Sequence, residues 1–332
     1  MLMCVVQADA SPGRRGRDTG SYVDRGERRE APHGGAHLWR IPGAGHWRCE
    51  TRGCNSWRVE LPDLPDPLPA PVVDSHCHLD STQAKSGLDP EDAVRLAAQV
   101  GVTRIVQIGC DPEGCRWAVQ AAERWPSVIA GVAIHPNDAA RMGPDLVPAL
   151  ELVEGLAQHP RVRAVGETGL DYFRTPDAAG RAVQRDAFAA HIAFAHTFDK
   201  TLVVHDRDAH EDILDVLDAE GWPARVVMHC FSGDDHFARA CLNRGAHLSF
   251  AGTVTFQANG RLRAALALAP LDRVLVETDA PYLTPMPLRG KPNASYLIPH
   301  TARFLAATLG IELERMCQAL NDNADAAFGG SW

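Results

Sequence analysis

The sequence predicts an α/β fold, a (β/α)8 TIM barrel preceded by an N-terminal extension. From residue 72 onward, eight short apolar runs alternate with stretches of helical period. Runs that are apolar on both faces are typical of parallel strands, because helices cover both sides of such a sheet. Eight such repeats over about 250 residues favour a closed barrel over an open doubly wound sheet.

The eight predicted strands are short and rich in Val, Ile and Leu, as buried parallel strands are. They occupy residues 72–76, 104–108, 128–134, 162–166, 202–205, 225–229, 246–250 and 274–278. Amphipathic stretches between them predict helices at residues 91–99, 115–124, 146–157, 184–196, 211–218 and 262–268. After the eighth strand, residues 297–309 and 312–320 predict two closing helices.

Residues 1–70 differ in kind from the barrel domain, which we place at residues 71–332. The extension is rich in Gly, Arg and Pro and shows no lasting apolar periodicity, so we expect it to be largely disordered. Prolines at residues 61–69 predict a stiff, extended connector. Trp39, Trp47 and Trp57 are unusual for a disordered tail, so a small docked patch around residues 38–60 and a start codon assigned too far upstream both stay open.

Composition excludes several classes of protein. The net charge of -9 argues against a protein that coats nucleic acid with its whole surface. No stretch approaches the roughly 20 apolar residues of a membrane span, and the N-terminus lacks the pattern of a signal peptide, so we expect a cytoplasmic protein without a membrane partner. Nine cysteines without regular spacing, among them Cys110 and Cys230 in apolar runs, predict buried reduced thiols.

Candidate metal ligands stand at the ends of predicted strands one, four, five, six and eight. In a barrel the chemistry lies at the C-terminal ends of the strands, and closure makes strands one and eight neighbours. We therefore expect one shared site. Its predicted ligands are His76, His78, Glu167, His205, His229 and Asp279.

The His76-Cys77-His78 segment is the first half of this predicted site. Side chains alternate along a strand, so both imidazoles share one face and Cys77 points the other way. A single His-x-His pair is weak support, since coincidence at a surface would explain it more often than not. The prediction gains weight because strands five and six also end in histidine and strand eight ends close to Asp279.

Glu167 is the carboxylate placed to bridge two metal ions. Many two-metal barrels use a carboxylated lysine instead, but Lys85, Lys200 and Lys291 are the only lysines and none ends strand four. Mixed imidazole and carboxylate ligands suit Zn²⁺, Mn²⁺ or Mg²⁺. Two ions about 3.5–4 Å apart activate a water and clamp the oxygens of a displacement at phosphorus. Glu167 and Asp279 are therefore the predicted catalytic residues, with Asp279 as both ligand and base.

Six segments together resemble the successive motifs of a known family. They are DSHCHLD at residues 74–80, GETGLDY at 166–172, HDRDA at 205–209, HCFSG at 229–233, ETDAPYL at 277–283 and RGKPN at 289–293. In this order and spacing they resemble the TatD family of metal-dependent deoxyribonucleases, over residues 72–329. The first 70 residues resemble nothing in that family.

The resemblance implies a barrel of the metallo-dependent hydrolase type, which cleaves DNA phosphodiester bonds with divalent cations and takes part in DNA processing or repair in the bacterial cytoplasm. It also implies ligand roles for the six strand-end residues named above. Two departures bear on substrate contacts or pH dependence. Asp206 stands where the family usually has Ser, and Ala294-Ser295 stand where it usually has Glu-Pro.

Cations and aromatic residues near the predicted mouth are candidates for substrate binding. Arg289 and Lys291 follow strand eight, where barrels often bind phosphate, although a solvated loop is the plainer interpretation. Tyr172, Phe231 and Tyr282 either stack an unpaired base or pack under a loop.

Three functions compete. The first is a two-metal deoxyribonuclease, an exonuclease acting on single strands or frayed ends of DNA. The second is a metal-dependent amidase, lactonase or phosphotriesterase acting on a small molecule, and the third is a non-catalytic protein that binds metal or nucleic acid. His135, which ends strand three, is not among the predicted ligands. We expect it to contact the substrate or to support a residue that binds metal.

Overall fold

The computed structural model describes residues 29–30, 37–40, 47–50 and 60–332. The chain divides into two compact units, residues 1–57 and 58–332. In the first unit, β1 (Arg29–Glu30), β2 (His37–Arg40) and β3 (Trp47–Glu50) form a three-stranded antiparallel sheet. The predictions of a largely disordered extension and of a docked patch lie mostly outside the described residues.

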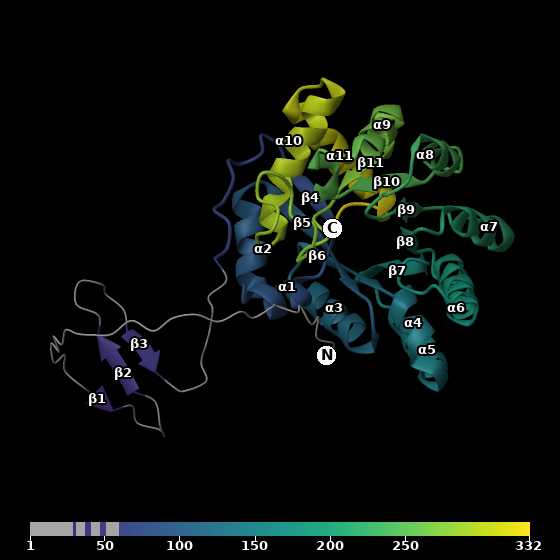
Figure 1. Cartoon of the computed structure of the whole chain (residues 1–332), viewed down its shortest axis with the longest axis horizontal. Coiled ribbons are helices and arrows are strands. Elements are labelled where there is room, and N and C mark those ends of the chain that lie inside the picture. The colour runs from purple at the N-terminus through teal and green to yellow at the C-terminus, as the bar shows by residue number, and fades with distance from the viewer. Residues whose placement is uncertain (1–28, 31–36, 41–46, 51–59) are drawn as a thin grey trace, which may run out of the picture. The chain divides into compact units, whose positions relative to one another are not determined.

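The second unit is a (β/α)8 barrel, as predicted (Figure 1). Its eight strands are β4 (Val72–Cys77), β5 (Val102–Gly109), β6 (Val128–Val132), β7 (Val162–Asp171), β8 (Thr201–Arg207), β9 (Val226–Met228), β10 (His247–Phe250) and β11 (Val274–Val276). Each pairs in parallel with the next along the chain. All eight predicted strands are therefore present, and they follow one another around the barrel in sequence order.

Helices connect the strands on the outside of the barrel (Figure 1). They are α1 (Leu79–Ser86), α2 (Pro90–Gln99), α3 (Pro112–Arg124), α4 (Pro136–Met142), α5 (Leu146–Ala157), α6 (Ala178–Thr197), α7 (His210–Glu220), α8 (Asp235–Leu242), α9 (Gly260–Leu268), α10 (Ile298–Leu309) and α11 (Leu313–Ala327). Sequence periodicity did not predict α1, α4 and α8, which have eight residues or fewer. Within the described residues, none of the helices has the length and apolar character that crossing a membrane requires.

Local sequence signals fix where several helices begin. Asp89 and Asp111 accept hydrogen bonds from backbone N–H groups of the first turns of α2 and α3, and a proline occupies the first position of each helix. Asp177 and Asp234 cap α6 and α8 in the same way. Such caps satisfy N–H groups that a helix start leaves without partners.

Hydrogen bonds between β4 and the residues that follow β11 close the barrel. Asp74 Oδ2 accepts from Thr278 Oγ1 at 2.6 Å, and Asp74 Oδ1 accepts from the Thr278 backbone N at 2.9 Å. One residue further, the backbone N of Asp279 donates to the carbonyl of His76 at 3.0 Å. The predicted closure is thus present, and it brings the end of strand eight beside the histidines of strand one.

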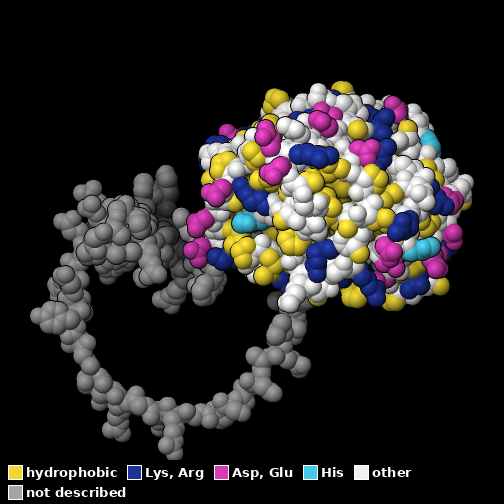
Figure 2. Space-filling model, turned by 90° about the horizontal axis from the view of Figure 1, so that it is seen from above, with side chains coloured by type: hydrophobic (Ala, Val, Ile, Leu, Met, Phe, Trp, Pro, Cys, Tyr) yellow, Lys and Arg dark blue, Asp and Glu magenta, His cyan; other side chains and the backbone are white. Residues whose placement is uncertain are grey.

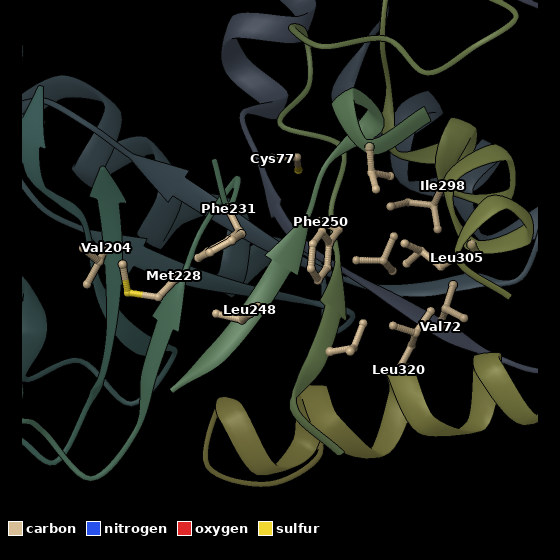
Figure 3. Packing of buried hydrophobic residues seen from close by; sticks show 14 of the residues in the cluster. Val72, Cys77, Val204, Met228, Phe231, Leu248, Phe250, Ile298, Leu305 and Leu320 are labelled. Carbon is tan, nitrogen blue, oxygen red and sulfur yellow. The ribbon is translucent and has the colours of Figure 1, made fainter. Parts of the chain in front are cut away.

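Apolar side chains pack on both faces of the strands. The outer layer lies between strands and helices and includes Phe250 on β10 and Leu305 on α10 (Figure 3). A second cluster comes from the alternate strand positions and from the end of α11. Its members are Val73, Val106, Ile108, Ile129, Ala164, Val203, Val227, Leu275, Ala324, Ala327 and Phe328. Burial on both faces explains why the strands are continuous apolar runs in the sequence.

The proline-rich connector packs along the barrel, over η4 (Ser295–Leu297) and α10. Tyr296 Oη donates to the carbonyl of Pro62 at 2.9 Å, and Arg303 Nη2 donates to the carbonyl of Asp66 at 2.8 Å. Leu68 is buried in the outer core, and its backbone N donates to the carbonyl of Val100. Residues 61–69 are outside any helix or strand, so their fixed path comes from these contacts.

Leu68→Ala in the full chain should lower the free energy of unfolding of the barrel by about 2–4 kcal/mol, because it leaves a cavity beneath the connector. Leu64→Ala is the matched control, since Leu64 lies in the same segment but is 43% exposed, and it should change stability little. Chemical denaturation of both variants measures the difference. Equal effects of the two substitutions would show that the connector does not stabilise the barrel.

Candidate metal centre

The six strand-end residues predicted from the sequence lie together at one end of the barrel. His76 is on β4, Glu167 on β7 and His205 on β8, whereas His229 directly follows β9. His78 follows β4 and Asp279 follows β11. Neighbouring strands that run in parallel deliver their C-terminal ends to the same rim, and this brings residues more than 200 positions apart into contact.

The two histidines at the end of β4 face each other inside the barrel. His76 Nε2 and His78 Nε2 are 3.3 Å apart, and Asp279 Oδ1 lies 3.5 Å from His78 Nε2. Cys77 is fully buried in the outer core, on the other face of the strand. The predicted alternation of the His-Cys-His segment is therefore confirmed. His78 Nδ1 faces the carbonyl of Ile108 at 3.0 Å, which orients this ring.

Glu167 is the centre of the cluster and reaches both halves of it. Its Oε2 lies 3.4 Å from His76 Nε2, and its Oε1 lies 2.6 Å from His205 Nδ1 and 3.0 Å from His229 Nε2. Burial opposes ionisation of this carboxyl, but the charges of His229 and His135 and hydrogen bonds from histidines hold its pKa well below its usual range. Glu167 is therefore an anion that imidazoles surround.

Glycines next to Glu167 allow β7 and β8 to approach closely. Gly169 has a φ of +133°, and a side chain on it would overlap the carbonyl oxygen of His205. A side chain on Gly166 would overlap Val203 in the same way. An alanine at either position would push β8 away and separate His205 from Glu167.

A buried carboxylate orients His229. Glu277 Oε1 accepts from His229 Nδ1 at 3.0 Å and from the backbone N of Cys230 at 2.8 Å, and Ser249 donates to Glu277 Oε2 at 2.5 Å. Burial disfavours the charged imidazole, yet Glu277 and Glu167 raise the pKa of His229 well above its usual range. With Nδ1 held by Glu277, Nε2 points at the cluster. Metal-binding histidines commonly have such a partner.

His135 also belongs to the cluster, although the sequence analysis left it out of the ligand set. Its Nε2 lies 3.5 Å from Glu167 Oε1, and ligand atoms of His135, Glu167 and His205 lie within 4.8 Å of one another. His135 directly precedes α4, and its Nδ1 accepts from the backbone N of Asn137. The signal in the sequence was a histidine at the end of strand three, the same signal that identified His205 and His229.

The cluster suits divalent cations. Two groups of donor atoms share Glu167, one with His76 and His78 and the other with His135 and His205, and within each group the atoms lie within 4.8 Å of one another. Nitrogen and carboxylate donors in this combination suit Zn²⁺ and Mn²⁺. His205 presents Nδ1 to Glu167 at 2.6 Å, whereas its Nε2 lies 3.5 Å from Asp171 Oδ2, so Nδ1 is the nitrogen that this ring offers to a cation in the cluster.

A cavity of about 820 Å³ opens above these residues. Such a volume lies at the upper end of the range for sites that bind small molecules. Its wall includes Cys110 and Cys230, which are free thiols and partly exposed rather than fully buried, because both stand at the mouth. Burial and neighbouring carboxylates hold the pKa of both thiols well above the usual range, so they stay protonated at neutral pH.

The predicted substrate residues lie at different distances from this cavity. Tyr282 lines it and is 49% exposed. Phe231 also lines it but is only 3% exposed and stacks on Phe237, and the Tyr172 hydroxyl donates to Asp212. These two rings mainly pack against the protein, whereas Tyr282 presents its ring to the mouth.

Arg289 and Lys291 are exposed and are not among the residues that line the cavity. Arg289 lies over the ring of Phe256, with Cζ 4.5 Å from the ring centre. The prediction that the loop with Arg289 and Lys291 binds substrate therefore applies only to a substrate long enough to extend outside the cavity, and it stays a prediction. Asn293, in the same motif, instead donates to the carbonyls of Thr278 and Tyr282 and holds the turn that carries Asp279.

The two departures from the family pattern have distinct surroundings. Asp206 lines the cavity beside His205, and its Oδ2 lies 2.5 Å from His210 Nδ1, an ion pair that raises the pKa of His210. Ala294 and Ser295 are buried at the start of η4, away from the cavity lining. Of the two departures, only Asp206 therefore changes the charge of the cavity wall.

Comparisons with known proteins agree with this geometry. A family model described as TatD related DNase matches residues 73–329. An uncharacterized metal-dependent hydrolase, TatD of Mycobacterium tuberculosis, is 44% identical over 264 residues, which cover 79% of this chain and 99% of that protein. A 3'-5' ssDNA/RNA exonuclease, TatD of Citrobacter rodentium, is 32% identical over 252 residues, covering 73% of this chain and 92% of that protein.

A solved structure of similar fold is YjjV, a TatD homologue from Escherichia coli K12. It superposes with a TM-score of 0.72 at 27% sequence identity and covers 78% of this chain and 98% of that one. The matched region in each comparison corresponds to the barrel unit in length.

The metal-free protein should lose stability as the pH rises from 6.5 to 9. Burial disfavours protonation of His78 and His205, but Asp279 beside His78, and Asp171 and Glu167 beside His205, raise both pKa values to about 9. A raised pKa contributes stability that is complete below the unfolded value of about 6.5 and is lost as the pH passes the folded value. Thermal unfolding of chelator-treated protein across this range measures the trend, and a rising midpoint would contradict it.

Glu277→Gln should weaken metal binding by about 10–100-fold, because the amide cannot hold His229 with the same charge. The isosteric change keeps the buried volume, so far-ultraviolet circular dichroism should stay that of the parent protein. Competition with a chromophoric chelator measures the affinity. Glu314→Gln, at an exposed position of α11, is the control and should bind metal like the parent protein. Unchanged affinity in Glu277→Gln would rule out its role in orienting His229.

Proposed function

The chain belongs to the TatD related DNase family of metal-dependent hydrolases, and we propose that it cleaves phosphodiester bonds at the ends of single-stranded DNA. The proposal includes two divalent cations, held by His76, His78, Glu167, His205, His229 and Asp279, with His135 beside them. The main support for this proposal is the position of Glu167. This residue belongs to two groups of donor atoms and lines the cavity.

Divalent cations in this position would lower the pKa of a bound water and neutralise charge on the oxygens of a phosphodiester. The chain supplies the remaining functions. Glu167 holds the two halves of the cluster at one separation, and Glu277 holds His229 with Nε2 facing inward. Glu167 and Asp279 both have lowered pKa values against the effect of burial, so both are anionic at neutral pH.

In this proposal, Asp279 accepts the proton of the attacking water. Its carboxylate lines the cavity, and its side chain is 15% exposed, so water reaches it. Hydrogen bonds and charges from His78 and His229 lower its pKa although burial acts in the opposite direction. Asp279 has a φ of +52°, a conformation uncommon for residues other than glycine but several-fold enriched for aspartate. This turn directs the carboxylate toward the histidines of β4.

DNA as the substrate class is supported by the names of relatives and by the distribution of charge on the surface. The relatives from Citrobacter rodentium and Salmonella typhimurium are both named 3'-5' ssDNA/RNA exonuclease. On the face that Figure 2 shows, Lys and Arg side chains are interspersed with Asp and Glu. An interspersed surface suits a protein that binds the end of a strand in one cavity better than one that coats a duplex.

One experiment separates the competing functions. The full-length protein, reconstituted in turn with Mn²⁺, Mg²⁺ and Zn²⁺, is incubated with 5'-labelled single-stranded DNA, a hairpin without overhang, and a panel of small esters, lactones and phosphotriesters. We expect stepwise shortening of the single strand from its 3' end, which excess chelator abolishes. Turnover of a small ester without any cleavage of DNA would favour an amidase or lactonase instead, and binding without turnover would indicate a non-catalytic protein.

Asp279→Asn should lower kcat on single-stranded DNA by about 10²–10⁴-fold, the usual contribution of a general base. The amide keeps the shape of the side chain and one oxygen for a cation, but it cannot accept a proton. Single-turnover rates at saturating metal separate this loss from weakened metal binding. Asp215→Asn, at an exposed position of α7, is the matched control. A rate for Asp279→Asn close to that of the parent protein would leave this residue with a ligand role alone.

A further inference from the structure

Two exposed aromatic rings lie in the cavity lining or against a residue that lines it. Phe173 is 60% exposed and Tyr282 is 49% exposed, and they are the only aromatic residues among the exposed large hydrophobic residues of the described chain. Tyr282 lines the cavity directly, and Phe173 precedes Arg174, which lines it too. A ring in this position is not packed in the apolar core, so part of its surface is available to a ligand.

A positively charged side chain lies over each of these rings. Arg207 Cζ lies 4.0 Å from the centre of the Phe173 ring, and Lys85 Nζ lies 4.4 Å from that of Tyr282. A cation at this distance is attracted by the face of the ring and fixes its orientation. Since Arg207 covers one face of Phe173, the exposed surface of this ring is the opposite face and the edge. A flat ring with one free face is the form in which aromatic side chains bind nucleic acid bases.

The two rings belong to the strands that carry the two carboxylates of the cluster. Phe173 and Glu167 come from β7, the fourth strand, and its following loop, whereas Tyr282 and Asp279 follow β11, the eighth strand. In a closed barrel of eight strands, the fourth and the eighth lie on opposite sides of the axis. A chain that extends from one ring to the other therefore passes over the metal-binding cluster.

The cavity wall is also divided by charge. Arg174 after β7, Arg207 at the end of β8 and Arg261 in the first turn of α9 line it, and none of them forms an ion pair or side-chain hydrogen bond within the described part of the chain. The carboxylates opposite, after β4 to β6, have partners in the protein. Asp80 accepts from Gln107, Asp111 accepts from the backbone of Gly114, and Asp138 pairs with Arg141. Besides Glu167, two carboxylates also line the β7 and β8 side, but both have partners, Asp171 in Asn137 and Asp206 in His210. The arginines of this side are thus the lining charges that lack a partner among the described residues.

We propose that this side is a binding track for the single strand that continues from the bond to be cleaved. The base of the nucleotide next to that bond stacks on Phe173, and Arg174 and Arg207 bind the phosphates that follow. The base of the terminal nucleotide stacks on Tyr282 across the mouth. The proposal rests on the function proposed above and deepens it, because it assigns the residues that select an unpaired strand.

The track explains selection against duplex ends in physical terms. A base within a duplex has both faces covered by its neighbours, so it stacks on Phe173 only after leaving the helix. A base of a single strand meets that requirement at much lower cost. Stacking of one base on one aromatic ring contributes enough to change affinity by about 10-fold or more, so one exposed ring suffices for a clear preference.

The test measures binding apart from cleavage. The full-length, metal-loaded protein is titrated with a fluorescent phosphorothioate-linked 10-nucleotide DNA, which resists hydrolysis, and Kd is read from anisotropy. Phe173→Ala should raise Kd about 10-fold, and Phe173→Tyr, which keeps the ring, should restore it, whereas Phe173→Leu should not. The same DNA with an abasic second nucleotide from its 3' end should bind the parent protein and Phe173→Ala almost equally.

Salt dependence tests the arginines. Arg174→Ala with Arg207→Ala should reduce the slope of log Kd against log salt by about 1.4 for two lost phosphate contacts on a single strand. Arg315→Ala is the matched control, because it removes an exposed cation from α11 and should leave the slope unchanged. Arg289→Ala with Lys291→Ala is the competing variant. If the slope falls in that variant and not in the Arg174 and Arg207 variant, the track does not run over β7 and β8.

The outcomes keep this proposal distinct from the proposed function. Cleavage of DNA with a Kd that does not depend on the ring at position 173 would overturn the track and leave the nuclease activity intact. If Kd depends on the ring for intact DNA but not for abasic DNA, and no metal supports cleavage, the track is supported and the nuclease activity is refuted. Equal loss of affinity by Phe173→Ala for intact and abasic DNA would show that Phe173 only positions Arg207, and it would overturn the stacking.

Discussion

The buried charge of Glu167 is the constraint on which the rest of the site depends. This carboxylate is 5% exposed, and its oxygens lie within 4 Å of five histidines. An isolated buried carboxylate would be neutral, because burial without a partner strongly disfavours the charged form. The surrounding imidazoles, or cations bound among them, are what keep it anionic. Because those imidazoles come from β4, β6, β8 and β9, the barrel has to close for the charge to be stable.

Beneath this layer, a second set of polar groups fixes the ligands in place. Glu277, Ser249 and Ser75 form a chain of hydrogen bonds under His229, and Asp74 connects β4 to Thr278 beside Asp279. All of these groups are buried, and each has a partner, as a polar network inside a protein requires. Below them most of the side chains inside the barrel are apolar, but Arg104 and Thr201 form hydrogen bonds with Asp325 and with the carbonyl of Ala327 at the end of α11.

The sequence alone predicted the barrel and most of the cluster because both leave local signals. Buried parallel strands are apolar runs, and a histidine or carboxylate at the end of such a run is conspicuous. Short helices such as α1 and α8 span about two turns and offer too few positions for a period to show. Glu277 was missed because it appears in the sequence as one more residue of strand eight, and only the closed barrel shows that His229 faces it.

The cationic residues show a different limit of sequence reasoning. Arg289 and Lys291 were selected because they follow Asp279 in the chain, but the loop turns away and Asn293 returns to hold the turn. Arg174, Arg207 and Arg261 are separated by 33 and 54 positions in the chain, and no local pattern connects them. They share one wall because their loops follow β7, β8 and β10.

In the function that we propose, the strand ends hold the residues of chemistry and the loops just beyond them hold the residues that bind the substrate. Glu167 and Phe173 are six positions apart on one side of the mouth, and Asp279 and Tyr282 are three apart on the other. A substitution in a loop can therefore change which strand is bound without moving the cluster, because the ligands are fixed by β-strand pairing and by buried hydrogen bonds. In the track that we propose, this spacing would also connect recognition with chemistry. A base stacked on Phe173 would lie on the Glu167 side of the mouth, so the same ring would select an unpaired strand and align the bond to be cleaved.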